Sequence, residues 1–123
     1  MNPPILTAEE MRMVKEVITL PLMIYYIHLD IAKINEVNLK LNYLLVRALN
    51  QVQHDIFNEH LEIKKELKRR GIKVIDEQQN QSGVEADYLC RGSRHHMSLR
   101  WEFIIAETLL KVSHYTGVPL TDG

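Results

Sequence analysis

Hydrophobic residues recur every three or four positions between Leu41 and Arg70, and this is the strongest pattern in the sequence. The stripe consists of Leu41, Leu45, Leu49, Val52, Ile56, Ile63 and Leu67. Such spacing places all of them on one face of an α-helix of roughly eight turns. Basic residues gather in its last turn, where they complement the helix dipole, and Gly71 is a typical residue at which a helix ends. A helix this long in a chain of 123 residues predicts one domain built mainly from long helices.

An earlier helix is predicted near the N-terminus. Thr7 and Glu10 have the spacing of a capping box, so this helix should begin near Ala8 and run to about Ile34. It is apolar on almost all sides, which is typical of a helix in a core or at a subunit interface. Pro21 lies in its middle and removes one backbone hydrogen bond, so we expect a kink there or two abutting helices. A loop at 35–42 should join the two helices.

Beyond Gly71 the hydrophobic pattern changes to a period of two. Ile72 and Val74 begin the alternation, which resumes from Val84 to Cys90 after a polar, turn-like segment at 80–83. We therefore expect one β-hairpin between 72 and 91. An isolated two-stranded ribbon is marginal in water, so its apolar side must lie on the helices or pair with another chain.

A third long helix is predicted to begin with Ser93 as its N-cap and to end near Tyr115, before Gly117. Its inward side should carry Met97, Trp101, Ile104, Ile105, Leu109 and Val112. The predicted fold class is α+β and mostly α, with three long helices and one β-hairpin inserted before the last helix. Residues 1–123 should form a single domain, with an extended leader at 1–6 and a loose tail at 118–123.

Charge and cysteine content restrict the possible functions. The formal net charge is −1, from 15 basic and 16 acidic residues, which argues against a surface adapted as a whole to nucleic acid or acidic lipid. Cys90 is the only cysteine, so an internal disulfide and a cysteine-type zinc site are excluded, and a cytoplasmic location fits best. The first strongly apolar stretch, Ile18 to Ile27, is about half the roughly 20 residues that a membrane span requires. We expect neither a signal peptide nor a membrane anchor.

A local basic cluster is the feature most indicative of a binding function. Six of the residues between 64 and 73 are Lys or Arg, and a second basic group follows the predicted hairpin. Because a hairpin returns the chain to its starting point, the two groups should lie together in space. The candidate residues for binding an anionic partner are Lys68, Arg69, Arg70, Lys73, Arg91, Arg94, His95 and His96.

The second basic group lies where positive charge is unfavourable. If the third helix begins at Ser93, residues 94–96 occupy its first turn and oppose the helix dipole by roughly 0.3 to 1 kcal/mol each. An anion bound by these side chains and by the free N–H groups of the first turn would offset that cost. The alternative is structural, with neutral histidines and with arginines paired to nearby acids.

No catalytic, metal or cofactor site is predicted. The histidines lack the His-x3-His and Glu-x-x-His spacings of metal-binding helices. The strand alternation puts Cys90 on the same face as Val84, Ala86 and Tyr88, which favours a core residue over a nucleophile. Trp101 could stack on a base, but a tryptophan on an apolar helix is more typical of a core. An enzyme would require a pocket around His95 and His96.

Two short motifs resemble a known family. Leu20-Pro21-Leu22-Met23 lies inside the apolar first helix, and Arg70-Gly71-Ile72-Lys73-Val74 lies at the end of the second. Both are similar to segments of the YhjD-like group, small helical proteins of spore-forming Bacillus-type bacteria without an assigned activity, and the resemblance covers about residues 14–115. It implies a bacterial, cytoplasmic protein linked to sporulation or to a phage-derived gene.

The residues themselves predict a non-enzymatic interaction or regulatory protein that acts as an oligomer. The first and third helices carry more apolar positions than one three-helix core can cover, which predicts a homodimer. The basic cluster predicts an anionic partner, either an acidic protein or a nucleic acid. The alternative function is a nucleic-acid-binding module that uses the hairpin as a wing beside the basic helix end, although a helix of about 30 residues is too long for a helix-turn-helix.

Overall fold

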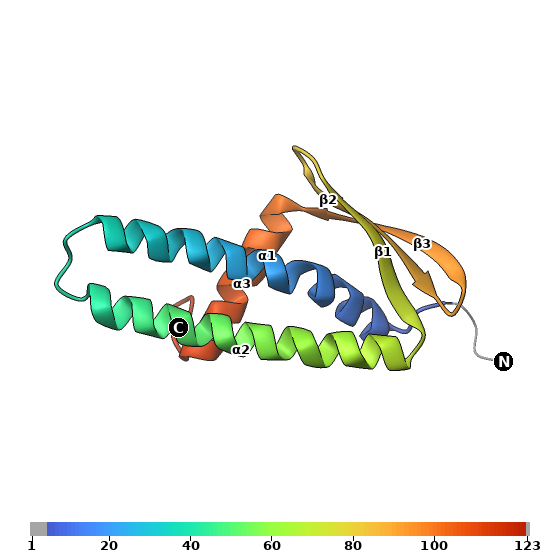
Figure 1. The fold of residues 1–123 in the computed structure, drawn as a ribbon, viewed down its shortest axis with the longest axis horizontal. Coiled ribbons are helices and arrows are strands. Elements are labelled where there is room, and N and C mark those ends of the chain that lie inside the picture. Colours follow the sequence, from blue (N-terminus) through green and yellow to red (C-terminus); the bar gives the residue numbers. More distant parts are fainter. Residues whose placement is uncertain (1–4, 123) are drawn as a thin grey trace.

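A computed structural model describes residues 5–122 as three helices and one three-stranded antiparallel sheet (Figure 1). The elements in chain order are α1 (Ala8–Glu36), α2 (Asn42–Arg69), β1 (Ile72–Gln79), β2 (Gly83–Cys90), β3 (Ser93–Arg100) and α3 (Trp101–Thr116). The predicted α+β, mostly α class is confirmed. The first four residues of the predicted leader and the last residue of the predicted tail lie outside the described residues.

The two long helices form an antiparallel hairpin whose ends follow the sequence signals. The capping box is present, because Thr7 N donates to Glu10 Oε1 at 3.1 Å and Glu10 N donates to Thr7 Oγ1 at 3.1 Å. Gly71, with a φ of 74°, follows the end of α2 in the left-handed conformation that a helix stop requires. α1 continues unbroken through Pro21, so the expectation of two abutting helices is wrong. The proline is exposed, while buried residues on both sides of it fix the helix in the core.

Ser93–Arg100 forms a third strand instead of the start of a helix, so the predicted hairpin is the first part of a three-stranded meander. The N-cap of α3 is Arg100, and the prediction that Ser93 caps this helix is wrong. The physical reason is the burial of Met97 and Leu99, which lie opposite apolar residues of β2 on the inner face of the sheet. Cross-strand packing there outweighs the local capping signal.

The core lies where the inner face of the sheet meets the helices. Its largest fully buried side chains are Ile18, Leu20, Met23, Ile56, Ile104, Val14 and Cys90. α3 crosses both long helices, and Lys111 Nζ lies 2.8 Å from Glu59 Oε2 of α2 and 4.0 Å from Glu16 Oε1 of α1. α3 buries only a narrow stripe, and the predicted inward positions Ile105 and Leu109 are instead about half exposed.

The distal half of the helical hairpin projects beyond the sheet and beyond α3 (Figure 1). We call residues 25–48 the arm. Within this range the structure describes every residue, and Ile27 is the one buried side chain. Large hydrophobic side chains on its surface are Tyr25, Leu29, Val37, Leu39, Leu41, Tyr43, Leu44 and Leu45. Two helices alone thus leave much of their apolar surface uncovered.

One helix in the described part of the chain, α1, is long and apolar enough to cross a membrane, with a mean hydropathy of 1.5 in its most apolar window. The core helix of a soluble protein can meet the same test of length and composition. In this fold the first half of α1 packs into the core through Val14, Ile18 and Leu20.

Candidate functional site

Carboxylates hold Arg69 and Arg70 at the end of α2 and Arg94 on β3. Arg69 and Arg70 both contact Glu66 one turn earlier, with Arg70 Nε 2.8 Å from Glu66 Oε1. Hydrogen bonds from Arg69 and then from Arg70 lower the pKa of Glu66 to about 2. On β3, Arg94 Nη2 donates to Asp87 Oδ2 at 2.6 Å. These positive charges are already matched by acids within the chain.

Arg91 is the arginine that joins the N-terminal turn, the end of α2 and the β2–β3 turn. It donates to both carboxylate oxygens of the buried Glu10, at 3.1 and 3.3 Å, and to the carbonyl of Arg70 at 3.1 Å. Its backbone N–H donates to the carbonyl of Gly71 at 2.8 Å. The hydrogen bonds from Arg91 and from the Thr7 backbone lower the pKa of Glu10 to about 2, in spite of its burial. Arg91 therefore connects the β2–β3 turn to the first turn of α1 and to the end of α2.

The two histidines of the predicted cluster lie on β3 and not in the first turn of a helix. The predicted conflict with a helix dipole, and the predicted anion site on free N–H groups of that turn, are therefore wrong. His96 is placed between two acids, with Nδ1 2.7 Å from Asp87 Oδ1 and Nε2 2.7 Å from Glu85 Oε2. Hydrogen bonding to Asp87, and then to Glu85, raises the pKa of His96. His95 stacks on Tyr88 at 5.4 Å between ring centroids.

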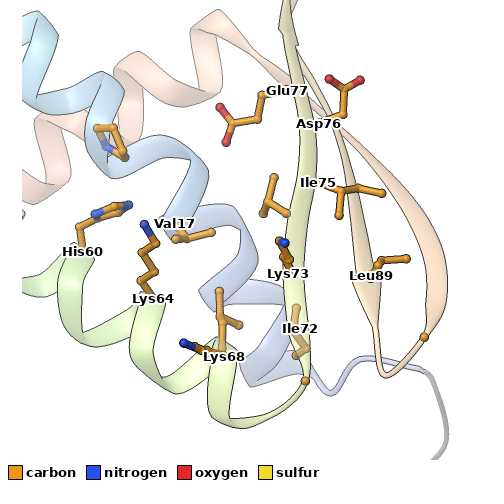
Figure 2. Close-up of a pocket in the computed structure, with 15 residues that line it drawn as sticks. Val17, His60, Lys64, Lys68, Ile72, Lys73, Ile75, Asp76, Glu77 and Leu89 are labelled. Carbon is orange, nitrogen blue, oxygen red and sulfur yellow. The ribbon is translucent and has the colours of Figure 1, made fainter.

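The lysines of the same region line a groove instead. It has a volume of about 930 Å³ and lies between α1, α2 and β1 (Figure 2). α2 contributes His60, Lys64, Leu67 and Lys68, whose spacing puts them on one helix face. Lys73 lines the groove from β1. Among the residues that the structure describes, none of these three lysines has an acidic oxygen within 4.0 Å.

The rest of the groove combines an apolar surface with an acidic end. The apolar side chains that line it are Val17, Pro21, Leu67, Ile72, Val74, Ile75 and Leu89. Asp76 and Glu77 lie toward the far end of the β1 wall, and Figure 2 shows Glu77 on the helix side of the strand. Burial raises the pKa of the Glu77 carboxyl. The groove is thus basic beside α2, apolar in its interior and acidic at one end.

The groove runs along the free edge of β1. Seven consecutive residues, Gly71–Glu77, line it, although successive side chains of a strand point to opposite faces of the sheet. A cavity can touch all seven only if it follows the strand edge. The strand order is β1-β2-β3, so one edge of β1 is covered by β2, and the other edge has no neighbouring strand within the described residues 5–122. Ile75 forms a bulge on this strand, because the register shifts between Val74 and Asp76.

Of the predicted anion-binding residues, the structure brings Lys68 and Lys73 to the groove, whereas the arginines and His96 are occupied by acids. Sequence reasoning did not select Lys64 and His60. Their signal is the four-residue spacing of positions 60, 64 and 68, which marks one face of a helix. Burial and the charge of Lys64 lower the pKa of His60, while a hydrogen bond involving the Val17 backbone acts in the opposite sense.

The described residues include no group of three or more His, Cys, Asp or Glu side chains that could hold a metal ion.

A family model described as YhjD protein matches residues 5–120. Comparison with curated proteins and with solved structures finds no match.

Proposed function

This chain belongs to the YhjD family, and from the geometry of its groove we propose that it is a non-enzymatic interaction protein, a homodimer that binds an anionic partner beside α2. One observation carries the proposal. Four arginines are matched by acids of the same chain, namely Arg69, Arg70, Arg91 and Arg94. Lys64, Lys68 and Lys73 surround a concave surface and have no acidic partner among residues 5–122. Unmatched positive charge around a cleft attracts negative ligands.

The charges and surface of the groove favour an acidic polypeptide over a nucleic acid. A phosphate backbone needs a continuous positive surface, but Asp76 and Glu77 lie on the β1 wall. The outer face of the sheet also carries Glu85 and Asp87, beside the strands that a nucleic-acid wing would use. The apolar interior gives a polypeptide side-chain contacts that a phosphate backbone would not use. Nucleic-acid binding therefore stays the alternative function.

Removal of the groove lysines should abolish most of the affinity for an acidic chain. We expect the triple variant Lys64→Gln/Lys68→Gln/Lys73→Gln to bind fluorescein-labelled polyglutamate at least about tenfold more weakly than the wild type in fluorescence anisotropy at low salt. The matched control is Lys15→Gln/Lys65→Gln/Arg100→Gln, which removes three basic residues outside both the groove and the arm. Within residues 5–122 these three also have no acidic oxygen within 4.0 Å.

Equal weakening in the two triple variants would contradict the groove as the site. The same titrations with a labelled oligo-dT strand test the alternative. Tighter binding of oligo-dT than of polyglutamate, with a steep loss as salt rises, would favour the nucleic-acid function.

The arm supplies the surface for self-association. Its eight exposed hydrophobic residues, Tyr25 to Leu45, are each 40% to 74% exposed and are spread over both helices and the loop that joins them. Each partner in a standard interface contributes about 800 Å², and a concentration of exposed apolar residues is typical of such an interaction surface. A second copy provides an identical pair of helices, and two such pairs can bury these side chains as a four-helix bundle. We therefore propose the arm as the dimer contact.

Charge placed on the arm should separate the dimer. We expect Leu41→Glu/Leu44→Glu to raise the dimer dissociation constant at least about 100-fold, because two apolar contacts become buried charges in each copy. Sedimentation equilibrium at tens of micromolar protein measures it. The control is Leu109→Glu/Leu110→Glu, two similarly exposed leucines on α3, outside the arm. A monomeric wild type, or dissociation by the α3 variant alone, would contradict the arm as the interface.

A further inference from the structure

We propose that the groove takes its anionic partner as an extended polypeptide strand, which pairs with the free edge of β1 and carries acidic side chains toward the lysines. This inference rests on the proposed function and names the class of partner. It predicts a fourth strand in the order partner-β1-β2-β3, with the partner lying over the groove between the sheet edge and α2.

The backbone of β1 has groups available for such pairing. The Arg91 N–H donates to the Gly71 carbonyl, so position 71 directs its backbone groups toward β2. In an antiparallel pair this direction alternates along the strand, and Lys73 therefore also faces β2. Ile72 and Val74 direct their N–H and C=O groups to the opposite, free side. No backbone hydrogen bond from outside the sheet reaches either residue in the part of the chain that is described.

The side chains around the edge indicate what sequence the strand should have. Residues of an added strand alternate between the two faces of the extended sheet. On the inner face, toward the helices, they would meet the apolar surface formed by Val17 and Leu67. Lys64 and Lys68 of α2 lie on this same helix side of β1, at the rim of the groove (Figure 2). On the outer face the nearest cross-strand neighbour of the added residues is Lys73. The expected partner therefore alternates hydrophobic with acidic residues.

The bulge at Ile75 limits the length of the pairing. It interrupts the regular edge after Val74, and the acidic pair Asp76 and Glu77 follows directly. An acidic strand is repelled beyond this point, so the bulge and the two carboxylates define one end of the site. A short segment of a partner fits this arrangement better than a long strand.

The test uses a labelled ten-residue peptide of alternating valine and glutamate and the full-length protein. Two further peptides carry N-methyl groups on all valines or on all glutamates, because only one of these sets of N–H groups can face β1. We expect one methylated peptide to bind at least about tenfold more weakly than the plain peptide, and the other to bind nearly as well. Hydrogen exchange should slow at the amides of Ile72 and Val74 on addition of the plain peptide, while the amides of α3 serve as the internal control.

The outcomes separate this inference from the proposed function. If both methylated peptides bind as tightly as the plain one and the β1 amides exchange at their usual rate, strand addition is wrong. Loss of binding in the Lys64→Gln/Lys68→Gln/Lys73→Gln variant would then still support a groove that binds anions, without strand pairing. If that variant binds the plain peptide as well as the wild type does, both proposals fail.

Discussion

The Gly83→Ala variant is expected to lose about 3 kcal/mol or more of unfolding free energy. A Cβ atom at position 83 would lie 1.9 Å from the carbonyl oxygen of Leu99 and 2.8 Å from the Cα of Arg100. Both are backbone atoms, so no side-chain rotation relieves the contact. β2 and β3 would have to separate at the point where β3 leads into α3, and overpacking already costs about 1–3 kcal/mol where side chains can move aside. Urea denaturation followed by circular dichroism measures the loss.

Gly117→Ala is the matched control, because nothing lies within 4 Å of a Cβ atom at that position. Its φ of 75° still makes alanine unfavourable, by about 1 kcal/mol. Gly83 does not have a positive φ, so the loss in Gly83→Ala comes from the collision with β3 and should clearly exceed the loss in Gly117→Ala. A loss in Gly83→Ala no larger than that in Gly117→Ala would show that the strands accommodate the methyl group.

The Glu10→Gln variant should lose about 2–3 kcal/mol of unfolding free energy at pH 7 and almost nothing near pH 2. Glu10 is buried, and Arg91 donates to both of its oxygens, so the change removes the carboxylate charge that this guanidinium contacts. The folded-state pKa of Glu10 is about 2, below the ordinary value of 4.5. Its contribution is therefore complete above about pH 4.5 and is lost as the pH falls toward 2. Urea denaturation at several pH values measures this.

Glu9→Gln provides the comparison for this prediction. Glu9 is the preceding carboxylate and lies 3.5 Å from Arg70, but its side chain is 59% exposed. Exposed ion pairs contribute little, so we expect a loss below about 1 kcal/mol. If the unfolding free energy of Glu10→Gln rises between pH 2 and pH 5 as steeply as that of the wild type, Glu10 is not the group whose ionisation stabilises the fold.

The start of α1 and the end of α2 could be predicted from sequence because their signals are local. The capping box of Thr7 and Glu10 and the glycine at 71 each determine a boundary through backbone geometry within a few residues. The long stripe of α2 similarly depends only on spacing along the chain. The distant packing of the fold does not change these preferences, and the boundaries appear where the sequence places them.

The third strand could not be predicted by the same means, because two local signals conflict in Ser93–Arg100. Gly92 and Ser93 resemble a helix start, and Met97 with Trp101 and Ile104 fits a helical stripe. The same segment also alternates, with Met97 and Leu99 apolar between polar neighbours. Whether this segment forms a helix or a strand depends on its pairing with the second edge of β2, and this pairing is a non-local interaction.

The site was predictable only in part. Glu66 lies three and four residues before Arg69 and Arg70 on one helix. The sequence therefore could have predicted that both arginines pair with this acid. The groove itself could not, since it exists only where the face of α2 lies across from the edge of β1. No pattern within either segment specifies the placement of the other.

The ion pair between Glu10 and Arg91 joins residues 81 positions apart. The strand pairings β1–β2 and β2–β3, in contrast, connect elements that are neighbours along the chain. A helical hairpin and a β-meander each close short loops, and chains with such local topology cross their folding barrier quickly. We expect the Glu10–Arg91 contact to form after that barrier, because it joins the two ends of the fold. Its loss should then accelerate unfolding and leave the folding rate nearly unchanged, so this ion pair sets how long the native state persists.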